Sequence, residues 1–97
     1  MIRHTVVFRL KHLTGSVEEA DFLAAARDLA NIPGVGNFEC LRQIGAKSNY
    51  RFGLSMEFAD HAVYSAYNNH PDHTAFVRDR WIPEVAAFLE LDFAPMT

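Results

Sequence analysis

Hydrophobic and polar residues alternate in two segments of the chain. In residues 2–11 one side of the repeat is mainly apolar, and it carries Ile2, His4, Val6, Phe8 and Leu10. The alternation is clearest in residues 50–58, where every second residue is apolar: Tyr50, Phe52, Leu54, Met56 and Phe58. A period of two with β-branched and aromatic residues is typical of a strand with one buried face. Both segments are therefore predicted to be β-strands.

Two further strands are predicted with weaker patterns. Residues 37–45 place Phe38, Cys40 and Ile44 on one face, with Arg42 beside them. The tail "AAFLELDF" alternates loosely and is interpreted as the last strand.

Between these strands, apolar residues recur at the spacing of an α-helix. Ser16 and Glu19 match a capping box, and apolar residues follow at helical spacing: Phe22, Ala25, Ala26, Leu29 and Ile32. "PGVG" ends this first helix. Asp60 is predicted to cap a second helix, "HAVYSAYNN", which stops before Pro71. A further helix is expected from Pro71 through Arg80, followed by a turn or short helix around Pro83.

The element order is therefore β-α-β-β-α-β. This order predicts a ferredoxin-like α+β fold, with a four-stranded antiparallel sheet and both helices on one face. The other face mixes Thr5, Val7, Leu41 and Ser55 with charged residues, which is too apolar for a surface entirely in solvent. We therefore expect a two-fold homodimer packed sheet to sheet.

Composition narrows the class of protein. The 97 residues fit a single domain spanning 1–97, and the net charge is −3 without a basic block, so no nucleic-acid partner is expected. The sequence shows neither a signal peptide nor an apolar run of membrane-spanning length. Its one cysteine excludes an intramolecular disulfide. A soluble cytoplasmic protein is expected.

His4 lies in the core-facing phase of the first strand. An unsatisfied buried polar group costs roughly 1–3 kcal/mol, so both ring nitrogens need partners there. A structural histidine with satisfied hydrogen bonds is the favoured interpretation, and a functional one is the alternative.

Residues 67–73, "YNNHPDH", contain two more histidines. His70 with Asn68 and Asn69 is typical of a turn that caps the new helix. A metal site would need a third ligand such as His4 or Asp72, and the His-x-x-His spacing is weak evidence. No metal and no cofactor are predicted, although a site on His4, His70 and His73 stays open as an alternative.

His73 and Tyr67 carry the sharpest chemical hypothesis. His73 would lie in the first turn of a helix, where the dipole lowers the pKa of an imidazole and favours a neutral base. A tyrosine hydroxyl beside it could donate a hydrogen bond to an oxyanion formed from a carbonyl. The pair would suit enolate chemistry. Ordinary core packing is the alternative for Tyr67.

Four segments together resemble one known family: "IRHTVVFRLK", "IPGV", "YRFGLSMEFAD" and "YNNHPDHTAFV". In this order they resemble the stress-responsive dimeric α+β barrel family, Dabb, over nearly the whole chain. The resemblance implies a ferredoxin-like protomer, a homodimer that forms a barrel, and a cavity between sheet and helices. Similar plant members are polyketide cyclases that perform an intramolecular aldol condensation. The resemblance to these members implies that His73 is the base, that Tyr67 assists it, and that His4 lines the cavity.

Small Ala25 replaces a bulky residue expected on the first helix, so the plant acyl pocket need not be reproduced. We expect a small apolar carbonyl ligand, bound by His4, Phe8, Phe38, Leu54, Met56 and His70, with His73 and Tyr67 catalytic. The rival hypothesis is a non-catalytic stress-response protein that acts through its dimer or a protein partner. A third hypothesis is that the protein is related to cofactor-independent monooxygenases, and it rests on fold analogy alone.

Overall fold

The computed structural model describes residues 1–96, and strands and helices follow the predicted order. The strands are β1 (Ile2–Leu10), β2 (Gly36–Arg42), β3 (Phe52–Phe58) and β4 (Val85–Phe93). The helices are α1 (Val17–Arg27), α2 (His61–Asn69), α3 (Pro71–Phe76) and α4 (Ile82–Glu84). A 3₁₀ helix η1 (Asp28–Asn31) extends α1, and a π-helical turn η2 (Val77–Trp81) joins α3 to α4.

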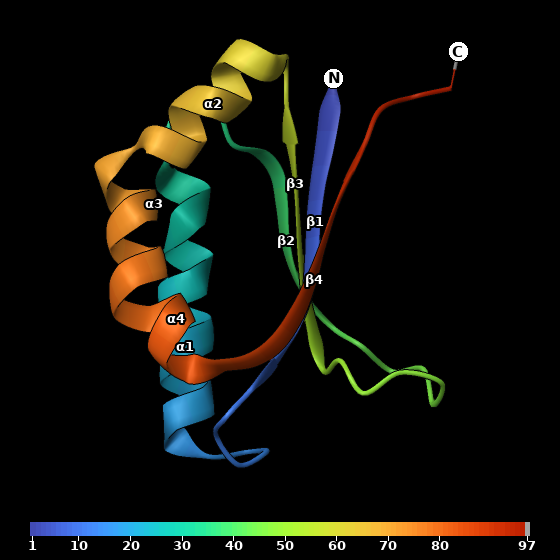
Figure 1. The fold of residues 1–97 in the computed structure, drawn as a ribbon, viewed down its shortest axis with the longest axis vertical. Helices are drawn as coiled ribbons and strands as arrows, with labels where there is room; N and C mark the ends of the chain where they lie inside the picture. Colours follow the sequence, from blue (N-terminus) through green and yellow to red (C-terminus); the bar gives the residue numbers. More distant parts are fainter. Residues whose placement is uncertain (97) are drawn as a thin grey trace.

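The four strands form one antiparallel sheet in the order β2-β3-β1-β4, and the helices cover one face of it (Figure 1). The helix-facing residues of β1 and β3 are all buried, as their alternation predicts: Ile2, His4, Val6, Phe8, Leu10, Phe52, Leu54, Met56 and Phe58. Phe22, Leu23, Ala26 and Leu29 pack on them from α1 and η1. The ferredoxin-like fold predicted from the sequence is confirmed.

Side-chain caps fix where the helices begin. The Glu19 amide donates to Ser16 Oγ at 3.2 Å, and the Glu19 carboxylate accepts from the Gly15 amide, one residue earlier than in the standard capping box. The Val63 amide donates to Asp60 Oδ1 at 2.9 Å at the start of α2. Both predicted caps are confirmed.

The break between α2 and α3 lies at His70, which is extended with φ −65° and ψ 137°. Pro71 occupies the first turn of α3, where its missing N–H is harmless. Beyond Phe76 the helix widens, and the Ile82 amide bonds the Val77 carbonyl five residues back. The predicted helix through Arg80 is therefore present, but its last part is the π-turn η2.

The far face of the sheet is partly apolar. Three side chains of β4 point to this face and are about half-exposed: Leu89 at 48%, Leu91 at 48% and Phe93 at 53%. Leu41 on β2 is 46% exposed. The apolar stripe of β4 therefore turns away from the helices, whereas its more polar residues face them.

Two predicted strand ends are wrong. Ile44 lies in the loop between β2 and β3 and is 92% exposed, so it does not share the face of Phe38 and Cys40. Tyr50 lies in the same loop, ahead of the start of β3 at Phe52. The Gln43 side chain explains both, because its amide donates to the Tyr50 and Ser48 carbonyls and holds the loop in a non-strand conformation. Among residues 1–96, no helix has the length and apolar character needed to cross a membrane.

Candidate functional site

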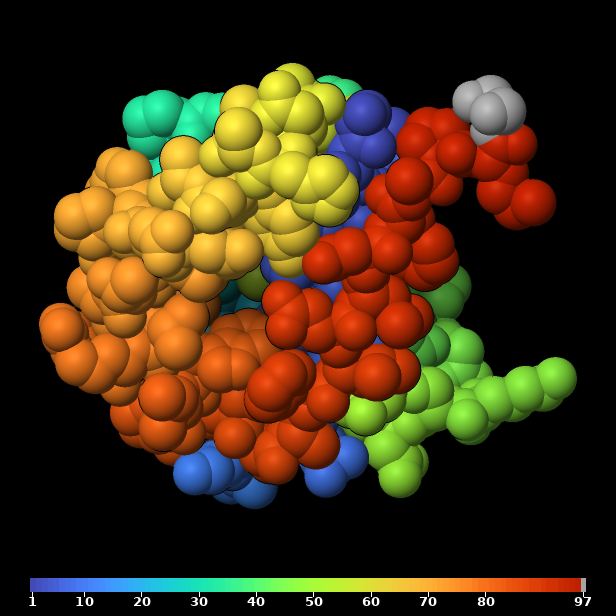
Figure 2. Space-filling view, turned by 45° about the horizontal axis from the view of Figure 1, so that its top comes forward, coloured from blue at the N-terminus to red at the C-terminus, as the bar shows by residue number. Residues whose placement is uncertain are grey.

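A cavity of about 410 Å³ lies between the sheet and the α2–α4 segment. Four side chains of β1 and β3 form its floor: His4, Val6, Leu54 and Met56. Its walls include Tyr67, His73, Phe76, Trp81, Phe88 and Glu90. Figure 2 shows the surface hollowed between the α2–α3 segment and β4. The surroundings are mainly apolar with a few polar groups, which is the usual character of a small-molecule site.

Tyr67 and His73 lie side by side in this cavity, although six residues separate them. Their ring centroids are 4.5 Å apart. Tyr67 belongs to the last turn of α2 and His73 to the first turn of α3, so the break at His70 brings the two rings onto one side.

The orientation of His73 is set by the chain just before the break. Its Nδ1 lies 3.1 Å from the Asn68 carbonyl oxygen, so Nδ1–H donates and Nε2 keeps its lone pair. Burial lowers the pKa of His73 below its usual value; the neighbouring His4 also lowers it, while the Asn68 hydrogen bond and Glu90 partly oppose the shift. The imidazole is therefore neutral at pH 7 and able to accept a proton.

Tyr67 is 2% exposed and stays a phenol. Burial raises its pKa first, and the negative charge of Glu90 raises it further. Within residues 1–96 its hydroxyl has no hydrogen-bond partner, while the ring lines the cavity. The hydroxyl is thus available to donate to a bound molecule.

His4 is buried, and both of its ring nitrogens face carboxylates. Nδ1 lies 2.6 Å from Asp92 Oδ1, and Nε2 lies 3.5 Å from Glu90 Oε1. Tyr64 donates its hydroxyl to Asp92 Oδ2 at 2.9 Å and lies 2.8 Å from His4 Nδ1. Burial raises the pKa of Tyr64, and the Asp92 hydrogen bond raises it further, so Tyr64 remains a donor. The Nδ1 side of His4 fits the favoured interpretation of a satisfied core histidine. Its Nε2 has only the longer contact with Glu90, and the same ring also lines the cavity.

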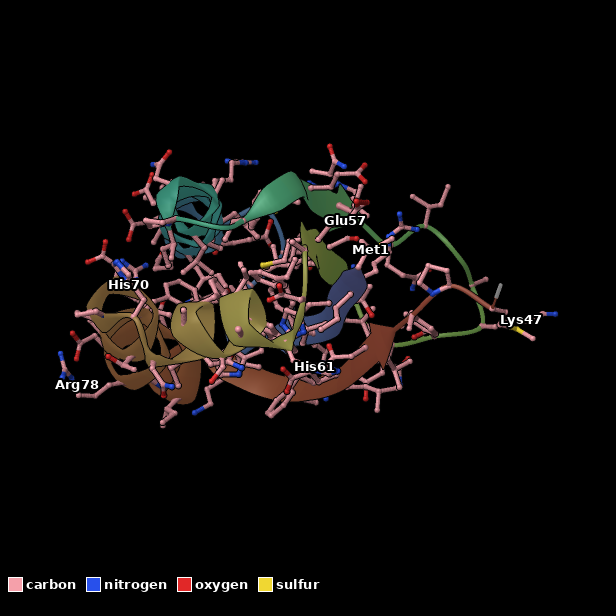
Figure 3. The ribbon with its side chains drawn as sticks, turned by 90° about the horizontal axis from the view of Figure 1, so that it is seen from above. Met1, Lys47, Glu57, His61, His70 and Arg78 are labelled. Atoms are coloured by element: carbon pink, nitrogen blue, oxygen red, sulfur yellow. The ribbon has the colours of Figure 1, made fainter. Side chains whose placement is uncertain are left out.

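The structure brings together five of the eight predicted site residues: His4, Leu54, Met56, Tyr67 and His73. Phe8, Phe38 and His70 do not line this cavity. Phe8 is fully buried among aromatic rings, and Phe38 packs at the edge of the core. His70 lies at the outer edge of the helix layer, away from the sheet (Figure 3), where its Nδ1 accepts from the Asp72 amide.

This position of His70 also separates the three histidines of the alternative metal site. In the described part of the chain, no three His, Cys, Asp or Glu side chains are grouped as a metal ion would require. His70 caps a helix end, and His4 and His73 line the cavity from different layers.

The residues of this region that sequence reasoning missed include Tyr64, Trp81, Glu90 and Asp92. A usable signal was present in β4, whose alternation places Phe88, Glu90 and Asp92 on one face. Pairing puts Glu90 opposite Val6 and Asp92 opposite His4. Two carboxylates in the core-facing phase of a strand need buried partners, which points to His4.

The comparisons with known proteins agree with this fold. The chain matches the model of a family described as "Stress responsive A/B Barrel Domain", Dabb, over residues 2–95. A Dabb family protein with a ferredoxin-like fold from Mesorhizobium loti is 61% identical, with a TM-score of 0.96 over 99% of this chain and 97% of that chain.

More distant structures share the fold. A dimeric ferredoxin-like protein of unknown function from Thermobifida fusca is 28% identical, with a TM-score of 0.81 over 97% of this chain and 90% of that one. A hydroxynitrile lyase from Passiflora edulis is 17% identical, with a TM-score of 0.85 over 99% and 94% of the two chains. A comparison with curated proteins finds no match.

Proposed function

The chain belongs to the stress-responsive A/B barrel (Dabb) family, and from this premise we propose that it binds a small carbonyl compound and forms an enolate from it without a cofactor. The observation that carries the proposal is the pair of His73 and Tyr67 in one apolar cavity. An enolate formed there would attack a second carbonyl of the same molecule, as in an aldol-type cyclisation.

His73 is the proposed base. Its Nε2 is unprotonated because Nδ1–H donates to the Asn68 carbonyl, and burial keeps the ring neutral at pH 7. Nε2 would take the proton from the carbon next to the carbonyl, and the C–H electron pair would move into the enolate. The proton held on Nε2 would then return to the alkoxide formed when the new carbon–carbon bond closes.

Tyr67 is the proposed hydrogen-bond donor to the oxyanion. Negative charge grows on the carbonyl oxygen as the proton leaves carbon, and a donor already positioned in a mainly apolar cavity stabilises that charge more than water does. The raised pKa of Tyr67 keeps its proton on the phenol, so it donates a hydrogen bond rather than the proton itself.

Enolate formation can be tested without knowing the natural substrate. We would follow hydrogen–deuterium exchange at the α-carbon of β-diketones and short polyketide mimics by NMR. His73→Ala is expected to lower the exchange rate about 10²–10⁴-fold. Tyr67→Phe is expected to lower it about 10²–10³-fold. His61→Ala is the matched control, because His61 is exposed at the start of α2. Exchange that survives both site variants unchanged would refute the mechanism.

A homodimer is the second part of the proposal. The far face of the sheet exposes Leu41, Leu89, Leu91 and Phe93, an apolar set that a second sheet would cover. The T. fusca structure is described as dimeric, as are ferredoxin-like proteins from Bacteroides fragilis and Jannaschia. The same face supports the rival function, a non-catalytic stress-response protein that acts through its dimer.

Analytical sedimentation tests the homodimer, and together with the exchange assay it distinguishes the catalytic function from the non-catalytic one. The wild type is expected to sediment as a dimer at micromolar concentration, and Leu91→Glu is expected to shift it toward monomer. A wild type that remains monomeric at this concentration would exclude the sheet-to-sheet dimer. A dimer without any α-carbon exchange would favour the non-catalytic function.

A further inference from the structure

One carboxylate in the cavity wall faces a histidine and no lysine or arginine among the described residues that line the cavity. Glu90 lies on the helix-facing side of β4, and its side chain is 52% exposed. Its carboxylate lies 3.5 Å from His4 Nε2, which is long for a hydrogen bond. Among the described residues that line the cavity there is no lysine or arginine. Glu90 therefore keeps capacity to accept from another donor.

Aromatic rings stand beside this carboxylate. Phe88 lies two residues away on the same face of β4, and Trp81 meets it edge-on with ring centroids 5.5 Å apart. Phe76 and Tyr67 continue the aromatic wall into the cavity. Aromatic faces attract organic cations, and a nearby carboxylate adds to that attraction. A carboxylate or phosphate ligand would meet only repulsion from Glu90.

The negative potential of Glu90 reaches the proposed reacting pair. Its charge raises the pKa of Tyr67, and it acts in the same direction on His73 against the larger effect of burial. Such a potential opposes the growth of negative charge on an enolate oxygen. A substrate that brings its own positive charge to Glu90 would cancel this effect.

We infer that the cavity takes a carbonyl compound that also carries a basic amine, with the ammonium group at Glu90 beside Trp81 and Phe88 and the carbonyl oxygen at Tyr67. The carbonyl end of this inference rests on the proposed function. The amine end rests on Glu90 and the aromatic wall, and it can be tested separately.

Trp81 is the single tryptophan of the chain and lines the cavity, so its fluorescence reports occupancy. The probes are three unreactive ligands of one length and different charge: phenylbutylamine, phenylbutanol and phenylbutyrate. The amine is expected to bind roughly tenfold more tightly than the alcohol, from the combined ion-pair and cation–π contributions. The carboxylate is expected to bind most weakly. Equal affinities, a preference for the carboxylate, or no binding of the amine would overturn the inference.

Variants assign the preference to one side chain. Glu90→Gln keeps the shape but removes the ion pair, so the preference for the amine over the alcohol is expected to fall to about two- to fivefold, which is what a cation–π contact at an exposed site supplies. Glu18→Gln is the matched control, because Glu18 is exposed in the first turn of α1 and is expected to leave the preference unchanged. A tenfold amine preference that persists in Glu90→Gln would contradict the assignment.

The two proposals fail in different ways. His73→Ala removes the proposed base but not Glu90, so the amine preference is expected to remain in that variant. If amines bind and no α-carbon exchange occurs in the wild type, the enolate function fails while the amine site stands. If exchange occurs and the three probes bind equally, the amine site fails alone.

Discussion

His4 and Phe8 lie four residues apart on the same face of β1, and both are nearly inaccessible, at 6% and 0% exposure. Their surroundings are opposite in character. Phe8 packs against the rings of Phe22, Phe52 and Trp81, with centroid distances of 5.0–5.8 Å. His4 meets carboxylates and a phenol. Equal burial is therefore reached at one end of the strand by filling space and at the other by satisfying hydrogen bonds.

The difference follows the residues of β4 that lie opposite β1. Phe88 lies opposite Phe8 in the register, whereas Asp92 lies opposite His4. Cross-strand neighbours are close enough to decide each other's environment. One strand pair thus carries an aromatic cluster at one end and a polar cluster at the other, and both reach the same cavity.

Truncation of Phe8, at the aromatic end of β1, should have the largest effect on stability. Phe8→Ala is expected to lower the free energy of unfolding by about 3–5 kcal/mol, because it removes buried ring contacts and leaves a cavity. Urea denaturation of the variant measures this loss. Leu13→Ala is the control, since Leu13 is 82% exposed and its truncation is expected to change stability by less than about 0.5 kcal/mol. A loss below about 1 kcal/mol for Phe8→Ala would show that this end is not tightly packed.

Removal of the acceptor at the polar end should have a smaller effect. Asp92→Ala leaves the Nδ1–H of His4 and the Tyr64 hydroxyl without their carboxylate, and it is expected to cost about 1–2 kcal/mol, limited by the partial exposure of Asp92. A double-mutant cycle with His4→Phe separates the pair from each residue alone. Additive losses in that cycle would mean that the two side chains do not depend on each other.

The smallest expected effect is a change in how stability depends on pH. Burial lowers the pKa of His73 in the folded state, so the unfolded chain binds this proton more readily. The neutral ring therefore contributes stability above its ordinary pKa of 6.5, and that contribution is lost as the pH falls through this value and toward the lower folded pKa. His73→Gln is expected to flatten the acid side of the stability profile. The activity of the wild type should keep its acid limb below pH 6.5.

Thermal denaturation between pH 7 and pH 5 compares the two proteins. Phe8→Leu is the matched control, because it weakens packing without removing a titrating group, and its profile should run parallel to that of the wild type. A His73→Gln profile that also runs parallel would mean that His73 is not buried as described.

Much of the fold could be predicted because its signals are local. The alternation of β1 and β3 set their buried face, and Ser16, Asp60 and Pro71 marked where the helices begin. The ends of β2 and β3 were wrong, because the Gln43 side chain holds the loop between them through contacts that no spacing rule describes.

The candidate site was harder to predict for a related reason. Tyr67 and His73 lie close in sequence, and the proline between them predicted the helix break that brings their rings together. Asp92 reaches His4 across 88 residues, a contact that only the pairing of β4 with β1 reveals. Phe8 and Phe38 were expected at the ligand because an aromatic side chain is usually buried. The residue type does not show whether a buried side chain packs in the core or lines a cavity.

The π-turn η2 sets the direction in which one residue of the cavity wall leaves its helix. A π-turn holds one more residue than the same stretch of α-helix, and here it ends at Trp81, which stands in the cavity wall. Each residue of an α-helix rotates the chain by about 100°, so if the same residues continued as an α-helix, Trp81 would leave the helix axis in a different direction. The shape of the pocket therefore depends on the backbone of this turn as well as on the side chains that line it.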